Sequence, residues 1–219
     1  MPSAVKNNGL TIALLTLFLI SIAGHFYAGW LYQNQKLAEH GAKTLSLGAY
    51  AVDPEFLSSV FENWESEFLQ MSAYVVLTAM LIQKGSSESR SPDEPPRDEN
   101  LKTQANRKGA PRILQAGPAA RWAYAHSLGL VLFLLFVLSF VLHWVNSAKA
   151  AAQTALQHGE KAPTILSYLG DPQLWFESFQ NWQSEFLSTA VLVLLSIWLR
   201  QKESPESKPV AAPHEQTGA

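Results

Sequence analysis

The chain contains no cysteine among its 219 residues. This absence excludes disulfide scaffolds, iron–sulfur clusters, zinc sites built on thiolates and cysteine nucleophiles, although it says little about the compartment. Charged residues are scarce, at 16%, and the formal net charge of −2 provides no basic surface for nucleic acid. The chain also lacks a Gly-x-Ser-x-Gly turn, a Gly-rich phosphate loop and a His-Glu-x-x-His pair. These absences argue against nucleic-acid binding and against the enzyme classes that those motifs mark.

Long apolar runs are the most prominent feature of the sequence. They cover residues 10–32, 68–82, 128–145 and 186–199. A helix of about 20 apolar residues crosses a hydrocarbon core of about 30 Å, so the first and third runs are long enough. The second and fourth runs are weaker, and the second needs the residues just before it. We therefore expect an all-α integral membrane protein with four transmembrane helices.

The distribution of positive charge predicts the orientation of these helices. Twelve of the 16 Lys and Arg residues lie in 1–9, 83–126 and 200–219, and the other two loops hold only four. Cytoplasmic loops carry the excess of Lys and Arg. We expect a multi-pass protein whose N- and C-termini are both cytoplasmic.

Two segments have the composition of disordered chain. Residues 85–120 are rich in Ser, Pro, Glu and Arg, and residues 203–219 are similar. Such segments bury too little apolar surface to offset the entropy of ordering. The predicted organisation is a two-span hairpin over 1–84, a disordered cytoplasmic linker over 85–120, a second hairpin over 121–202 and a disordered cytoplasmic tail over 203–219.

An internal repeat relates the two hairpins. At an offset of 118 residues with no gap, 61–69 align with 179–187, and seven of the nine residues are identical. The same offset pairs further residues over some 80 positions, among them His25 with His143, His40 with His158 and Asp53 with Asp171. Each copy holds an even number of spans, so the copies run in the same direction. This predicts parallel repeats around a pseudo-two-fold axis along the membrane normal, in an antiparallel bundle of four helices.

The helices should extend beyond the bilayer. Gly41 and Gly159 predict left-handed stops for the first helix of each hairpin, and the adjacent histidines, His40 and His158, are expected to cap exposed carbonyls. Asp53-Pro54 predicts the start of a helix that runs to residue 84, about 46 Å long. We therefore expect a small acidic helical head outside the membrane, built from 33–66 and 151–184.

Ionisable residues recur at one depth near the outer face. The residues are His25, Glu67, His143 and Glu185. Counted from the cytoplasmic ends of their helices, each lies about 24–26 Å from the inner boundary of the membrane. We expect His25 to pair with Glu67 and His143 with Glu185. Asn63 and Asn181 lie one turn above the glutamates, and Trp64 and Trp182 belong to an interfacial belt of aromatic residues.

Four interpretations of this polar layer remain open. A Glu–His–Asn network can simply hold the two hairpins together, since polar contacts commonly join helices in membranes. Alternatively, the two histidines and two glutamates hold a metal ion, His25 and His143 hold a haem, or the carboxylates form a proton or ion pathway. No cofactor is expected, with metal and haem as the alternatives. The lipid bilayer is the expected partner, and a homo-oligomer or a membrane-protein partner remains open.

The run Phe-Glu-Asn-Trp-Glu-Ser-Glu-Phe-Leu-Gln-Met at 61–71, followed by 73–77 and Gln-Lys-Gly-Ser at 83–86, resembles a family of bacterial membrane proteins known as a domain of unknown function. The resemblance covers nearly the whole chain. It implies a bacterial cytoplasmic (inner) membrane location and carries no activity or site residues. The resulting hypothesis is a non-enzymatic structural, sensing or partner-binding component held by the Glu–His–Asn layer. The alternative is a proton or ion conductor, or a metal- or haem-binding redox protein, using the same layer.

Overall fold

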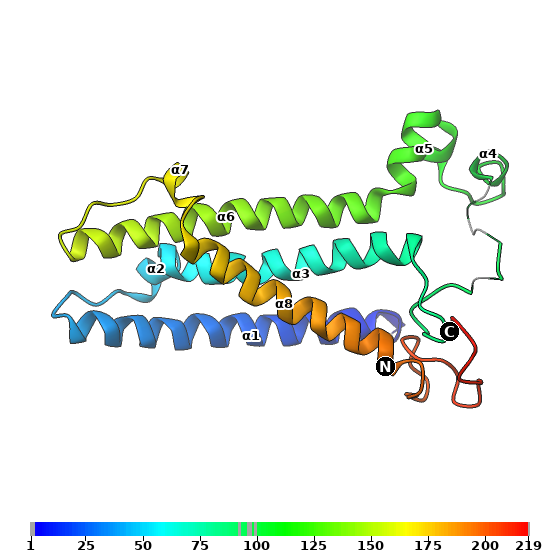
Figure 1. Cartoon of the computed structure of the whole chain (residues 1–219), viewed down its shortest axis with the longest axis horizontal. Helices are drawn as coiled ribbons and strands as arrows, with labels where there is room; N and C mark the ends of the chain where they lie inside the picture. The colour runs from blue at the N-terminus through cyan, green and yellow to red at the C-terminus, as the bar shows by residue number, and fades with distance from the viewer. Residues whose placement is uncertain (1–2, 92, 96–97, 99, 219) are drawn as a thin grey trace. The chain divides into compact units, whose positions relative to one another are not determined.

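The computed structural model describes residues 3–91, 93–95, 98 and 100–218. Within these residues every regular element is a helix, and no strand occurs. The order is α1 (Ser3–Glu39), α2 (Leu47–Tyr50), α3 (Pro54–Met80), α4 (Leu101–Gln104), the 3₁₀ helix η1 (Arg112–Gln115), α5 (Pro118–Ala125), α6 (Ser127–Gln157), α7 (Ile165–Tyr168) and α8 (Pro172–Leu195). Figure 1 shows the four long helices α1, α3, α6 and α8, which are joined by short helices, turns and loops. The predicted all-helical class is confirmed.

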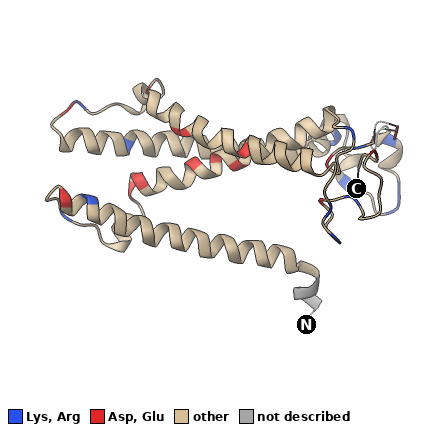
Figure 2. Cartoon of the chain, turned by 60° about the horizontal axis from the view of Figure 1, so that its bottom comes forward, with Lys and Arg blue, Asp and Glu red and all other residues tan. Residues whose placement is uncertain are grey.

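Two helices are long and apolar enough to cross a membrane. They are Asn7–Glu39, within α1, and Ser127–Gln157, which is α6. None of the residues in the most apolar window of α1 is buried, and large apolar side chains such as Leu17, Leu19 and Ile20 are exposed. Figure 2 shows α1 as an uninterrupted uncharged stretch over most of its length. An apolar surface of this extent is typical of a helix that faces lipid or another protein.

Helices α3 and α8 begin at the Asp-Pro pairs, as the sequence predicted. Asp53 Oδ1 accepts a hydrogen bond from the backbone N–H of Glu55 at 3.1 Å, and Asp171 Oδ1 accepts one from Gln173 at 2.9 Å. In both cases proline follows the aspartate and takes the first helical position, where the missing N–H costs nothing. The predicted aspartate caps are confirmed.

The ends of α1 and α6 also follow the prediction. Gly41 and Gly159 both adopt the left-handed conformation, with φ of +65° and +71°. The Nδ1 atoms of His40 and His158 lie 2.8 Å from the carbonyl oxygens of Lys36 and Thr154, which also accept the backbone N–H of the same histidines at 3.3 and 3.2 Å. The histidines therefore cap the helices, as expected.

The second and fourth apolar helices end earlier than expected. α3 ends at Met80 rather than at residue 84, because the N–H of Gln83 donates to Ser89 Oγ at 2.9 Å and leaves the helical pattern. α8 ends at Leu195, and a turn at 196–198 follows within the fourth apolar run. The Arg200 guanidinium donates to the carbonyl oxygens of Ile197 and Leu199 there, so this turn is capped by a side chain.

Helix boundaries recur at a constant spacing. α2 and α7 cover 47–50 and 165–168, α3 and α8 begin at 54 and 172, and α1 and α6 end at 39 and 157. Each of these pairs is 118 residues apart, which is the offset of the sequence repeat. Tyr50 and Tyr168, also 118 apart, are both buried.

The chain divides into two compact units. The first consists of Met1–Val60 and Val145–Ile165, and the second of Phe61–Trp144 and Leu166–Ala219. In the first unit the rings of Phe26, Tyr50 and Phe56 form a cluster with centroid distances of 5.1–5.6 Å. Trp30 Nε1 and Asn34 Nδ2 both donate to the carbonyl oxygen of Leu45 and tie the loop after α1 to that helix.

The second unit packs α6 against α8 through aromatic rings. Phe136 lies edge-on to Trp182 at 6.2 Å, and Phe140 contacts Trp175 at 5.9 Å. The side chain of Gln70 on α3 donates to Thr189 on α8. These contacts hold the helices that carry the polar centre described next.

The segments predicted to be disordered contain mostly turns. The linker region includes α4, η1 and the start of α5, and the tail has no helix among its described residues. Lys208 in the tail is buried, and its Nζ donates to the carbonyl oxygens of Gly85, His214 and Gln216. The disorder of both segments stays a prediction.

Candidate functional site: a buried histidine among carboxylates

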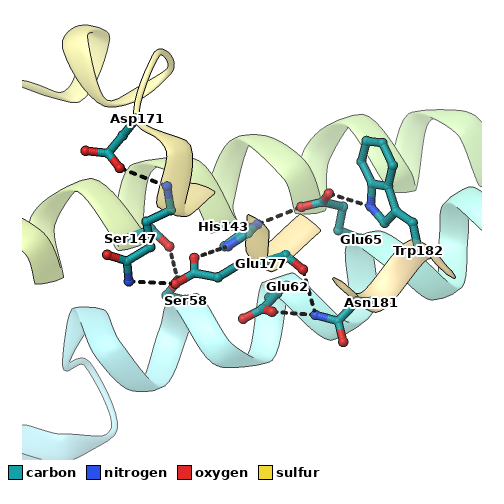
Figure 3. Close-up of polar contacts among 10 residues, drawn as sticks. Ser58, Glu62, Glu65, His143, Ser147, Asp171, Glu177, Asn181 and Trp182 are labelled. Carbon is teal, nitrogen blue, oxygen red and sulfur yellow. Dashed lines mark hydrogen bonds and ion pairs between the residues drawn. The ribbon is translucent and has the colours of Figure 1, made fainter. Parts of the chain in front are cut away.

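The centre of the site is His143 on α6, which is fully buried. Its Nδ1 lies 2.7 Å from Glu65 Oε2 on α3, and its Nε2 lies 3.3 Å from Glu177 Oε2 on α8. Figure 3 shows the imidazole between these two carboxylates. One side chain from each of three helices therefore meets at this ring.

Glu65 is held from both sides. Its Oε1 accepts a hydrogen bond from the Trp182 indole N–H at 2.8 Å, while its Oε2 faces His143 (Figure 3). The carboxylate is fully buried. An ionised carboxylate can only accept hydrogen bonds, so the proton of the short contact belongs to His143 Nδ1. A length of 2.7 Å is typical of a charge-assisted hydrogen bond.

Two further carboxylates, those of Glu62 and Glu177, lie near His143. Glu62 on α3 accepts a hydrogen bond from the Asn181 side-chain amide, and Glu177 Oε1 accepts one from Gln173 Nε2 at 2.9 Å. Ligand atoms of Glu62, His143 and Glu177 all lie within 4.8 Å of one another. These residue types and this spacing are suited to a cation.

Carboxylates outnumber cationic side chains at the site. The helices α3 and α8 contain no Lys or Arg, and α6 contains only Lys149. Burial raises the pKa of the Glu62 carboxyl; His143 opposes the rise, and the carboxylates of Glu177 and Glu65 add to it. The cluster thus concentrates three carboxylates around a single histidine.

Some residues of the predicted polar layer belong to the network around His143, and others do not. His143, Asn181 and Trp182 belong to the network. The expected partner of His143 was wrong: its ring nitrogens contact Glu65 and Glu177 instead of Glu185. Of the remaining predicted residues, Asn63 and Glu67 are exposed, and Trp64 and Glu185 are partly exposed.

The error on α8 is one of depth, because Glu177 and Glu185 are eight residues, or about 12 Å, apart along the helix, and the error on α3 is one of direction. Residues two apart on a helix point about 200° from one another. Glu65 and Glu67 therefore lie on opposite faces of α3, and the face that carries Glu65 is the buried one. Trp64 packs its ring edge-on against Phe61 at 5.6 Å.

The other histidine of the predicted layer lies in the first unit. His25 Nε2 is 3.1 Å from Ser59 Oγ, and its ring lies 5.5 Å from that of Phe56. Its predicted pairing with Glu67 would join the two units and stays a prediction. His25 and Ser59 correspond to His143 and Glu177 at the offset of 118. Each histidine therefore contacts the residue at the same repeat position through Nε2, a hydroxyl in the first case and a carboxylate in the second.

Sequence reasoning missed the three glutamates that surround His143. It favoured positions that are identical in the two copies, such as Glu67 and Glu185. Within the aligned nine-residue motif, the only two differences replace Glu62 by Gln180 and Glu65 by Gln183. The differences between the copies, rather than the identities, marked the residues of this site.

Comparison with known proteins identifies the chain at the level of a family. Residues 1–219, the whole chain, match the family described as "Domain of unknown function (DUF6766)". The chain matches no curated protein and no solved structure.

Proposed function

The chain belongs to the DUF6766 family, a domain of unknown function, and from its own geometry we propose that it is a non-enzymatic integral membrane component. Four spans cross the membrane as two parallel hairpin repeats, with both termini cytoplasmic and a small helical head outside. In the bacterial inner membrane, the protein acts as a structural or partner-binding element. The network around His143 fixes α3, α6 and α8 to one another.

The observation that carries the proposal is the chain of contacts Trp182–Glu65–His143–Glu177, whose two central residues are fully buried. It links three helices through side chains within the second unit. Hydrogen bonds between helices hold membrane bundles together, because apolar side chains contact lipid as readily as one another. His143 also lies near the end of a predicted span, where the cost of a buried polar group is lowest.

Helix lengths and exposure support four spans. α3 has 27 residues and α8 has 24, which correspond to about 40 Å and about 36 Å. Both lengths exceed a hydrocarbon core of about 30 Å. Exposed apolar side chains such as Met80, Leu187 and Leu195 are suited to lipid on these helices.

The constant spacing of helix boundaries supports the duplicated hairpin. A hairpin repeated at 118 residues brings each counterpart to the same side of the membrane, because each copy crosses it twice. Lys43 and Lys161, which are counterparts, then lie outside, and Lys102 lies in the cytoplasm.

Cysteine labelling tests this topology directly. The natural chain has no cysteine, so single variants Lys43→Cys, Lys161→Cys and Lys102→Cys need no background removal. All three positions are exposed. In intact cells, a membrane-impermeant maleimide should label the first two and leave the third unlabelled until the membrane is permeabilised. The reverse pattern would refute the proposed orientation, and labelling of only one of the two counterparts would refute the parallel repeat.

A further inference from the structure

Glu62, His143 and Glu177 have ligand atoms close enough together to share one ion. Side-chain atoms of Glu62, His143 and Glu177 lie within 4.8 Å of one another, and the contact between His143 Nε2 and Glu177 Oε2 is 3.3 Å. Zinc binds nitrogen and oxygen at about 2.0–2.2 Å in tetrahedral geometry, which separates the ligands by about 3.4 Å. Small rotations of the two glutamate side chains would therefore complete such a site.

The hydrogen bond on the other ring nitrogen prepares His143 for this role. Histidines that bind metals usually donate their second ring N–H to a carboxylate, which fixes the tautomer and the ring orientation. Glu65 accepts that hydrogen bond here, and Trp182 in turn fixes Glu65. The other ring nitrogen, Nε2, lies 3.3 Å from Glu177 Oε2, and a metal ion would take the place of the proton between these two atoms.

The charge balance also calls for a cation. Buried charges in proteins are paired or coordinate metals. Three glutamates meet at this point, with Glu65 buried and Glu62 and Glu177 partly exposed, and the three helices provide one lysine in total, Lys149 on α6. A divalent ion would balance the two glutamates that face Nε2.

The positions of the three glutamates hold neutral residues in the other repeat. At the position of Glu177 the first copy has Ser59, and at those of Glu62 and Glu65 the second copy has Gln180 and Gln183. Ser59 Oγ contacts His25 Nε2 at 3.1 Å, so a neutral side chain is sufficient for a hydrogen bond at the equivalent place. Among the residues that the structure describes, His143 has carboxylates at these three positions, and the corresponding positions for His25 hold Ser59, Gln180 and Gln183. The site is therefore single.

We propose that Glu62, His143 and Glu177 bind one divalent transition-metal ion, with Glu65 as the positioning residue for His143. One imidazole and two carboxylates suit Zn²⁺, Mn²⁺ or Fe²⁺, and three protein ligands leave a coordination position open. Both ring nitrogens of His143 are already engaged with carboxylates, which favours this ligand set over axial ligation of a haem. The inference rests on the network of the proposed function and adds an ion to it.

Zinc binding to the full chain tests the proposal. The detergent-purified protein is stripped with a chelator and dialysed against Zn²⁺ alone, and bound metal is measured by mass spectrometry. We expect one Zn²⁺ per chain, lost in the variant that combines Glu62→Gln with Glu177→Ser. Each substitution installs the residue of the other repeat, which limits the damage to folding.

Two matched controls should retain the ion. His25→Ala removes the histidine of the other copy, and Glu67→Gln with Glu185→Gln removes two nearby carboxylates outside the cluster. Glu65→Gln should weaken Zn²⁺ binding by about 10–100-fold, the usual effect of losing such an orienting partner. Loss of the metal in His25→Ala, or its retention in the double variant, would overturn the assignment.

A measurement on the natural sequence covers the case in which the double variant fails to fold. X-ray absorption of the Zn²⁺-loaded protein should show one imidazole and carboxylate oxygens around the metal at about 2.0–2.2 Å. Two imidazoles, or none, would overturn the proposal. Absence of bound Zn²⁺, Mn²⁺ and Fe²⁺ from the natural protein would also overturn the proposal. Such a result would not refute the proposed topology or the hydrogen-bond network, because cysteine labelling and unfolding measurements test those separately.

Discussion

Replacing Glu65 by glutamine tests whether the network around His143 stabilises the fold. Both carboxylate oxygens of Glu65 accept a hydrogen bond from an N–H group, Oε1 from Trp182 at 2.8 Å and Oε2 from His143 at 2.7 Å. Glutamine has one oxygen and one NH₂ group, so it can satisfy only one of these donors. The other N–H would face the NH₂ group inside the protein, where water does not reach.

The magnitude follows from this geometry. A buried donor left without an acceptor costs about 1–3 kcal/mol. We therefore expect Glu65→Gln to lower the free energy of unfolding by about that amount. Glu67→Gln is the matched control, since it is the same substitution two residues away at an exposed position. It should change stability by less than about 0.5 kcal/mol.

A double-mutant cycle separates this cause from general damage. Trp182→Phe removes the indole N–H, so in the double variant the glutamine oxygen can face His143 and its NH₂ group no longer faces a donor. The combined loss should then be smaller than the sum of the single losses by about 1 kcal/mol or more. Unfolding in detergent with a denaturant, followed by far-UV circular dichroism, measures all four proteins. Equal losses for Glu65→Gln and Glu67→Gln, or simple additivity in the cycle, would refute the reasoning.

Two further predictions concern packing and helix capping. In Gly29→Ala the new Cβ would overlap the Tyr50 hydroxyl, so this variant should lose about 1–3 kcal/mol of stability. Gly24→Ala places its Cβ in open space and should be neutral or gain up to about 1 kcal/mol. Thermal unfolding compares the two variants, and equal stability changes would contradict the packing argument. Asp171→Ala removes the acceptor for the Gln173 N–H at the start of α8 and should cost about 1 kcal/mol in a denaturant titration, with Asp171→Asn close to the natural protein. A loss from the asparagine variant as large as that from alanine would argue against a capping role.

The repeat and the local signals predicted the helices well. Asp-Pro pairs gave the starts of α3 and α8, and Gly41 and Gly159 gave the ends of α1 and α6, because capping depends on a few adjacent residues. The ends of α3 and α8 were predicted less well. They depend on contacts of Ser89 and Arg200 with turns that follow the helices, and such contacts leave no periodic signal.

The sequence alone determined that the chain is helical, that it has apolar segments of membrane-spanning length and that its elements recur every 118 residues, since composition and periodicity carry this information. It also identified His143 as a polar residue within an apolar helix. Only the tertiary structure decided which carboxylates reach that histidine. Counting residues along each helix shows neither how far that helix is shifted along its neighbours nor the direction in which a side chain points around it. For that reason Glu65 and Glu177, rather than Glu185, contact His143.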